Sequence, residues 1–355
     1  MYFKQILNEE CGCSSYIVAS RRSKEAAIID PALDIRHYLD LARDREFTIR
    51  YIIDTHIHAD HISGNRKLAA ATDAALCLHE SADVLFPFEP LKDGQEIRLG
   101  QLILTILHTP GHRPEAISIL VTNPPRSAAP GIVLSGDTLF VGDVGRPDFG
   151  GPEGARNQYR SVHKLLGLDD FVEVFPAHFE GSCGRGMCGR PSTTIGFERR
   201  FNPILQLSEA DFVAYASEPP ARPLNMEAIL ATNRGEAEID WAQPHTTDVR
   251  SLTPAEAQHW LKDHQAAVID VREPQEYAAG HLPGALLIPQ AELATRIAEV
   301  PRNRDLLVVC ASGMRSLRSA QFLKHYGFPR VVNLSGGTNG WIEAALPVDS
   351  GPRGA

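Results

Sequence analysis

In the N-terminal part of the chain, short apolar runs alternate with stretches in which apolar residues recur at helical spacing. Runs rich in β-branched residues predict strands, whereas apolar residues three or four positions apart predict helices. The predicted strands are residues 15–18, 26–29, 49–53, 103–107, 117–121, 132–134 and 172–175. The predicted helices are residues 35–41 and 157–166. Several strands end beside a histidine or an aspartate, where loops usually carry functional side chains.

A second unit begins at Thr253, because Thr253, Pro254 and Glu256 form a capping box with proline at the first helical position. From there the predicted strands are residues 267–271, 285–288, 306–309 and 331–334, and the predicted helices are residues 293–300 and 316–326. This alternation predicts a small parallel sheet with helices on its faces. Residues 218–223 and 241–248 interrupt the pattern, so we predict domains at 1–247 and 248–355.

Composition and charge narrow the classes of partner. A prior of roughly 150 residues per domain predicts two domains for 355 residues. The net charge is −9 and no basic block occurs, so nucleic acid and anionic membranes are not expected as partners. No apolar stretch approaches the roughly 20 residues that span a bilayer, and the first residues are unlike a signal peptide. The six cysteines do not suggest a disulfide framework, so we expect a cytoplasmic protein with reduced thiols.

Four potential metal ligands lie within six consecutive positions, where a β-branched run ends. They are His56, His58, Asp60 and His61. Three further candidates follow predicted strands, with glycine or proline close by to permit sharp turns; these are His112, Asp137 and His178. A lone histidine is more often a surface or core residue than a ligand. The whole set, however, predicts a metal centre.

The pattern H-x-H-x-D-H, followed by His112, Asp137 and His178, resembles the metallo-β-lactamase superfamily over about residues 1–200. The resemblance implies an αββα sandwich with the metal at one edge. All seven ligands of a two-metal hydrolase are present, with His56, His58 and His112 on one side, Asp60, His61 and His178 on the other, and Asp137 bridging. Ligand number alone favours a dizinc thioesterase of the glyoxalase II type.

The residues around the ligands resemble the persulfide dioxygenase branch instead, namely residues 109–118 and 145–149. A different domain also occupies the place of the C-terminal helices of glyoxalase II. This resemblance implies one Fe(II) per chain, held by His56, His112 and Asp137 as a facial triad with open positions for persulfide and O2. The remaining residues then orient the ligands or, in the alternative with two zinc ions, bind the second metal; they are His58, Asp60, His61 and His178.

Three residues are candidates for binding the thiol substrate. Arg146 can grip an anionic thiol by charge-assisted hydrogen bonds, although an ion pair with Asp148 is an equally good explanation. Arg113 is a second candidate. Cys183 lies in a Gly/Cys/Arg-rich stretch after His178, where it is either an accessory thiol or part of a flexible loop.

A second reactive group follows the predicted strand 306–309, where Cys310 opens a six-residue loop that ends at Arg315. Backbone N–H groups in such a loop converge, and together with the following helix N-terminus they favour a thiolate or a persulfide. The other residues of this sulfur loop are Ala311, Ser312, Gly313, Met314 and Ser316. Arg315 offers a positive charge to an anionic sulfur donor. The alternative is a buried structural cysteine.

The segments around this loop, residues 268–273, 276–285 and 334–341, together resemble a rhodanese domain over residues 249–350. The resemblance implies that Cys310 is the catalytic cysteine, and we interpret Asp270, Arg272 and His281 as structural organisers. The loop is one residue shorter than in phosphatases of this fold, which suits sulfur better than phosphate.

As a whole, the chain is similar to persulfide dioxygenase–rhodanese fusions. This implies an α/β protein that oxidises a low-molecular-weight persulfide, such as glutathione persulfide, with O2 to sulfite and thiol. Sulfane sulfur would pass between thiosulfate and thiol through a Cys310 persulfide. The alternative is a dizinc glyoxalase II-like thioester hydrolase fused to a sulfur-carrier rhodanese domain. We expect a homo-oligomer, since such folds commonly form dimers or tetramers.

Overall fold

The computed structural model describes residues 1–8, 12–147, 151–180, 184, 187–216, 226–236, 249–293, 296–326, 328 and 330–351. The chain forms two compact units, Met1–Pro220 with Ile229–Glu238 and Ala221–Ala228 with Ile239–Ala355. The predicted boundary between residues 247 and 248 lies outside the described residues. The same is true of both predicted linkers, residues 218–223 and 241–248.

Two six-stranded sheets form the centre of the first unit, with the orders β1-β2-β3-β4-β5-β6 and β12-β11-β10-β9-β8-β7. The strands of the first sheet are β1 (Tyr2–Asn8), β2 (Cys13–Ala19), β3 (Glu25–Ile29), β4 (Thr48–Ile53), β5 (Ala75–His79) and β6 (Glu89–Leu91). Those of the second are β7 (Glu96–Leu99), β8 (Leu102–His108), β9 (Ile117–Thr122), β10 (Ile132–Gly136), β11 (Glu173–Pro176) and β12 (Thr193–Thr194).

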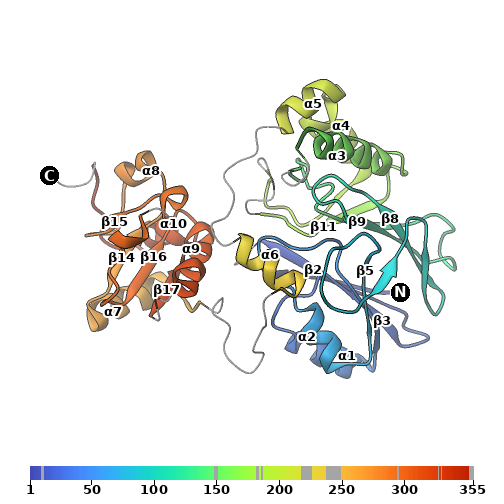
Figure 1. The fold of residues 1–355 in the computed structure, drawn as a ribbon, viewed down its shortest axis with the longest axis horizontal. Helices are drawn as coiled ribbons and strands as arrows, with labels where there is room; N and C mark the ends of the chain where they lie inside the picture. The colour runs from blue at the N-terminus through green and yellow to red at the C-terminus, as the bar shows by residue number, and fades with distance from the viewer. Residues whose placement is uncertain are drawn as a thin grey trace. The chain divides into compact units, whose positions relative to one another are not determined.

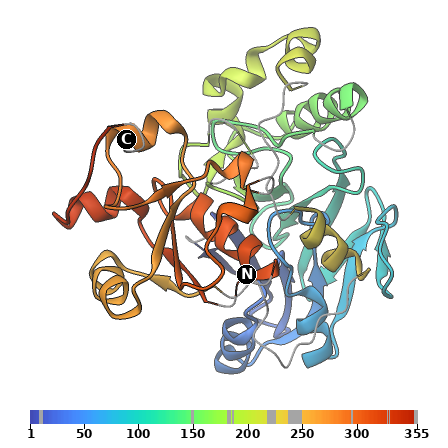
Figure 2. The same ribbon diagram turned by 60° about the vertical axis from the view of Figure 1, so that its left-hand side comes forward.

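Helices cover the outer faces of both sheets. Those near the first sheet are α1 (Arg36–Arg45) and α2 (Asn65–Ala71), with α6 (Met226–Arg234) beside them. Those on the second are α3 (Gly151–Leu166), α4 (Ile195–Phe201), the 3-10 helix η1 (Pro203–Gln206) and α5 (Glu209–Ala216). Figure 1 shows the blue and the green helices on opposite sides of the strands, and Figure 2 shows the green group from a second direction. The predicted αββα sandwich is confirmed.

The central strands β2, β3 and β10 are buried along nearly their whole length, because these strands are covered on both faces of their sheets. Neighbouring residues of β3 point to opposite sides: Ile29 joins the core between the sheets, whereas Ile28 packs with Tyr38 and Leu68 beneath α1 and α2. A continuous apolar run in the sequence therefore marks a strand between two cores.

The second unit has a five-stranded sheet of order β13-β17-β16-β14-β15, in which every paired strand is parallel. Its strands are β13 (Ser251–Leu252), β14 (Ala267–Asp270), β15 (Leu286–Leu287), β16 (Leu306–Val309) and β17 (Val331–Leu334). Its helices are α7 (Pro254–His264), α8 (Pro274–Ala279), α9 (Met314–His325) and α10 (Gly337–Glu343), with the 3-10 helices η2 (Gln290–Glu292) and η3 (Ile297–Glu299). The predicted small α/β domain with a central parallel sheet is confirmed, as is the capping box at Thr253.

The predicted α-helix at residues 293–300 is wrong. Its described part contains the 3-10 helix η3 and turn residues. Leu293 and Val300 are both buried and lie at helical spacing, but Pro301 prevents a helix from continuing beyond them. So short an apolar segment favours tight 3-10 turns over an α-helix. Within the described ranges, no helix combines the length and apolarity that crossing a membrane requires.

Candidate functional site

Loops at the ends of strands from both sheets bring the predicted metal ligands together. The loop after β4 carries His56, His58, Asp60 and His61, and the turn between β8 and β9 carries His112. Asp137 directly follows β10, and His178 follows β11. Because β10 and β11 are parallel, these last two residues emerge at the same edge of their sheet.

His56, His112 and Asp137 form one buried group, whose ligand atoms all lie within 4.8 Å of one another. Oδ2 of Asp137 lies 3.8 Å from Nε2 of His56 and 3.5 Å from Nε2 of His112. Among the described residues, this oxygen has no hydrogen-bond partner. A buried carboxylate oxygen without a donor is costly. Two imidazole nitrogens and this oxygen therefore fit a divalent transition-metal ion.

The backbone around this group sets how the imidazoles face. Nδ1 of His112 donates to the carbonyl of Arg146 at 2.7 Å. The lone pair of the ring is therefore at Nε2, on the side of Asp137, where an ion would bind. The side chain of Gln158, on α3, accepts from the N–H of His112 at 2.8 Å and donates to the carbonyl of Thr138 at 2.8 Å. Gln158 therefore links the loop of His112 to the loop of Asp137.

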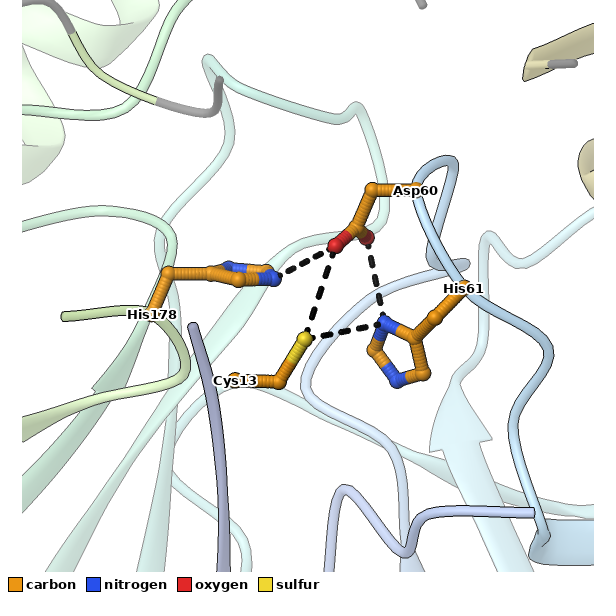
Figure 3. A group of neighbouring side chains, drawn as sticks. All are labelled: Cys13, Asp60, His61 and His178. Carbon is orange, nitrogen blue, oxygen red and sulfur yellow. Dashed lines mark hydrogen bonds and ion pairs between the residues drawn. The ribbon is translucent and has the colours of Figure 1, made fainter. Parts of the chain in front are cut away.

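Asp60, His61, His178 and Cys13 form a second group (Figure 3). Nε2 of His178 lies 2.8 Å from Oδ2 of Asp60, and Nδ1 of His178 lies 2.7 Å from Oδ1 of Asp137. Nδ1 of His61 lies 3.2 Å from Oδ1 of Asp60. Each nitrogen of the His178 ring thus faces a carboxylate, and this ring connects the two groups.

The charges of the site match what a metal needs. Burial alone would raise the pKa of Asp137, but His178 and His56 outweigh it and hold that pKa well below its ordinary value. Burial is opposed in the same way at Asp60, whose pKa is lowered by His178 and His61. Burial also lowers the pKa of His56 well below its ordinary value. Ionised carboxylates beside a neutral imidazole are the protonation states that metal binding requires.

His58 is paired with a different carboxylate, that of Asp30. Its Nε2 lies 3.2 Å from Oδ1 of Asp30, which also accepts from the N–H of Thr55 at 2.7 Å. Burial lowers the pKa of His58, but the hydrogen bond and charge of Asp30 prevail and raise it to about 9. Nδ1 of His58 has no hydrogen-bond partner in the described part of the chain. In this arrangement His58 is paired with Asp30.

Cys13 is a site residue that sequence reasoning missed. Its Sγ lies 3.7 Å from Oδ2 of Asp60 and 3.7 Å from Nδ1 of His61. It is disulfide-bonded, so the expectation of reduced thiols does not hold for this residue. No motif in the sequence marks it, because it reaches the site through tertiary contacts: Cys13 forms an isolated β-bridge with His178, and the N–H of Ser14 donates to the carbonyl of Ala177 at 2.7 Å.

The predicted substrate-binding residues have different surroundings. Arg113 is buried and donates through Nε to Oε1 of Glu115 at 3.0 Å; the same oxygen accepts from the N–H of Ile57 at 3.1 Å. Arg113 therefore braces the histidine loop from within. Arg146 is buried and contacts the site through its carbonyl. Cys183 and Asp148 lie outside the described residues, and a substrate-binding role for these residues stays a prediction.

In the second unit, Cys310 follows β16 and is fully buried. Its Sγ accepts a hydrogen bond from the N–H of Gly313 at 3.1 Å and lies 3.3 Å from the hydroxyl of Ser316. The single hydrogen of that hydroxyl also faces the side-chain oxygen of Asn333, at 2.7 Å. Gly313 has φ 96°, a conformation that favours glycine, and α9 begins at the next residue. The N–H of Gly313, the hydroxyl of Ser316 and the N-terminus of α9 thus lie at the sulfur, a setting that stabilises negative charge.

Arg315 is paired with a carboxylate. Its guanidinium donates to both oxygens of Glu276, at 2.8 and 2.5 Å, and these hydrogen bonds raise the pKa of Arg315. The positive charge expected to attract an anionic sulfur donor is therefore compensated in large part. Nearby, Asp270 and Arg272 form a buried ion pair at 2.7 Å, in keeping with a structural role.

Comparison with known proteins gives two family matches. Residues 8–178 match the model of the metallo-beta-lactamase superfamily, and residues 253–344 match that of the rhodanese-like domain. The persulfide dioxygenase ETHE1 of Homo sapiens is 30% identical over 212 residues, which cover 58% of this chain and 76% of that protein.

Two solved structures agree with these matches. A metallo-beta-lactamase from Staphylococcus aureus subsp. aureus COL is 27% identical with a TM-score of 0.67, covering 94% of this chain and 98% of its own. ETHE1 from Myxococcus xanthus is 29% identical with a TM-score of 0.59, covering 67% of this chain and all (100%) of its own.

Metal binding is expected to stabilise the first unit. A divalent ion at about 100 times its dissociation constant adds about 2.7 kcal/mol, or about 5–10 °C in the thermal midpoint. Differential scanning calorimetry of metal-free protein, with and without added metal, measures this shift. Asp137→Asn should abolish it. Asp143→Asn, which changes a neighbouring buried aspartate, should keep it. Equal shifts in both variants would contradict the assignment of Asp137.

Glu276→Gln is expected to release Arg315 toward anionic donors. Because partly exposed ion pairs contribute up to about 1 kcal/mol, KM for thiosulfate should fall by as much as about fivefold. Steady-state sulfur transfer from thiosulfate to a thiol measures it. Glu299→Gln removes the same charge from a pair with Arg296 and should leave KM unchanged. An unchanged or higher KM in Glu276→Gln would show that Arg315 does not meet the donor.

Proposed function

Because this chain belongs to the metallo-beta-lactamase superfamily and carries a rhodanese-like domain, we propose that it is a persulfide dioxygenase joined to a sulfurtransferase. The proposed substrate is a low-molecular-weight persulfide, with glutathione persulfide as the first candidate. Persulfide, O2 and water would yield thiol and sulfite. The named relatives, the Homo sapiens and Myxococcus xanthus ETHE1 proteins, support the choice of chemistry.

The observation that carries the proposal is the arrangement of His178 and His58. Both ring nitrogens of His178 face carboxylates, and His58 pairs with Asp30. His56, His112 and one oxygen of Asp137 then form a compact group, whose ligand atoms all lie within 4.8 Å of one another and could hold a single ion. A 2-His-1-carboxylate set is typical of non-haem Fe(II) enzymes that bind a substrate and O2 together. Bound Fe(II) would supply the redox chemistry.

The protein's own groups would prepare that site. His178 holds Oδ1 of Asp137, so that Oδ2 stays directed at the two imidazoles. The carbonyl of Arg146 and the side chain of Gln158 keep His112 in one orientation. Arg146 and Arg113 are the proposed contacts of the anionic thiol, with Cys183 as an accessory thiol. We assign these roles to a first domain of residues 1–247.

The second domain, residues 248–355, is proposed to carry sulfur on Cys310. Its thiolate would attack the outer sulfur of thiosulfate, so that an S–S bond forms on Cys310 and sulfite leaves with the electron pair of the broken bond. A thiol then takes the sulfur and restores the thiolate. The N–H of Gly313 and the hydroxyl of Ser316 are placed to stabilise the sulfur anion at each stage. Sulfite is thus a product of both domains.

Anaerobically purified protein is expected to hold about one iron per chain and to consume O2 when glutathione persulfide is added. Metal quantitation and an oxygen electrode measure these quantities. His112→Ala should lose both, whereas Cys310→Ser should keep both, because Cys310 lies in the other unit. Two zinc ions per chain with thioester hydrolysis would instead support the dizinc alternative. The observation that favours that alternative is that Nδ1 of His58 has no hydrogen-bond partner among the described residues.

Cys310→Ser is expected to reduce sulfur transfer from thiosulfate to a thiol by at least about 1,000-fold, since a nucleophile is lost. A sulfite-release assay measures the rate. Cys77→Ser is the matched control, because Cys77 is another buried free cysteine. A Cys310→Ser protein that still transferred sulfur at the wild-type rate would show that another thiol carries it.

A further inference from the structure

Asn233 lies near the end of α6 and is buried against the loop that carries the histidine motif. It falls in neither family match, since these cover residues 8–178 and 253–344. Its side-chain amide donates to the carbonyl of His58 at 2.8 Å and to the carbonyl of His61 at 2.8 Å. Its side-chain oxygen accepts from the N–H of Ser63 at 3.0 Å.

These three hydrogen bonds use both donors and the acceptor of one carboxamide on the backbone of residues 58–63. An aspartate at this position would lack the two donors. Asp60 lies between the two carbonyls that Asn233 binds, so this contact fixes the segment on both sides of it. Loss of these hydrogen bonds would leave buried backbone groups without partners, which costs free energy. The arrangement in which Asn233 binds the loop is therefore the stable one.

The end of α6 is itself anchored without Asn233. The guanidinium of Arg66, on α2, donates to the carbonyl of Thr232 at 2.6 Å. The N–H of Leu85 donates to the carbonyl of Arg234 at 2.7 Å. The residues on either side of Asn233 are therefore bound to the first unit, and its side chain extends from a fixed support.

The loop that Asn233 holds connects to the metal ligands in two steps. Oδ2 of Asp60 is 2.8 Å from Nε2 of His178, as Figure 3 shows. Nδ1 of His178 is 2.7 Å from Oδ1 of Asp137, which leaves Oδ2 of Asp137 facing His56 and His112. Movement of the loop would release His178 and allow the carboxylate of Asp137 to turn.

We propose that Asn233 is a positioning residue for the metal centre, which keeps Asp60 on His178 and thereby keeps Asp137 directed at the ion. The proposal rests on the metal site proposed above, but not on its reaction. Partners of metal ligands typically change metal affinity by about 10–100-fold when they are removed. Loss of Asn233 should have an effect of this size although the residue touches no ligand side chain.

The test uses Co(II) as a spectroscopic probe on the metal-free full-length protein. Asn233→Ala should bind Co(II) at least about tenfold more weakly than the wild type in a competition titration with a chelator. Its visible absorption bands should shift, because the ligand geometry changes. Asn202→Ala is the matched control: Asn202 is also buried, and its side chain also makes hydrogen bonds to Asp143, Glu198 and Ile204, none of which is one of the seven candidate ligands.

The control separates positioning from general stability. Both alanine variants should lower the thermal midpoint of the metal-free protein, while Asn202→Ala should keep the wild-type Co(II) affinity and spectrum. If Asn233→Ala does not fold, Asn233→Asp takes its place, because it keeps the volume and the acceptor for Ser63 but loses both donors. Wild-type Co(II) binding in the Asn233 variant would overturn the proposal, as would an equal loss in Asn202→Ala. Absence of Co(II) binding in the wild type would overturn the metal site itself.

Discussion

The imidazole of His178 lies between two buried carboxylates, and the metal centre depends on this contact. One ring nitrogen lies 2.8 Å from Asp60 and the other 2.7 Å from Asp137, so both nitrogens have carboxylates of the protein as partners. In the proposed single-ion site, this ring and Asp60 are partners of the ligands, and the ring orients the remaining oxygen of Asp137. Under that proposal, a fold with candidate ligands for two metals holds one ion. The same contact links Asp60 and His178, which are far apart in the sequence, within one site.

The two units solve a similar chemical problem in different ways. In the first, carboxylates and imidazoles from four loops create a site for a cation, and burial keeps the hydrogen bonds between them strong. In the second, the loop between β16 and α9 places the N–H of Gly313 at the sulfur of Cys310, and the first turn of α9 places the hydroxyl of Ser316 there, so an anion is stabilised without a metal. Beside that loop, Glu276 forms an ion pair with Arg315 and compensates part of its positive charge. Both arrangements suit the sulfur chemistry proposed above.

Much of the fold could be predicted because strands buried on both faces are continuous apolar runs. β16 and β17 have the predicted bounds for this reason. β1 was missed because it is only partly buried and its pattern is mixed, and residues 293–300 show that helical spacing alone does not make a helix. The candidate ligands could be named from the sequence because the motif and its resemblance identify the residues, and the structure places them close together. Asn233, Gln158 and Cys13 could not be found in this way, since their roles arise from tertiary contacts with segments far along the chain.

X-ray absorption at the iron edge of the anaerobically purified protein tests the central claim most directly. A single ion bound by His56, His112 and Asp137 predicts scattering from two imidazoles and one carboxylate oxygen, with the other positions filled by light atoms and no neighbouring metal. A metal–metal distance of about 3.5–4 Å, with further imidazole scattering, would contradict it, because such a signal requires His178 to leave Asp60 and Asp137.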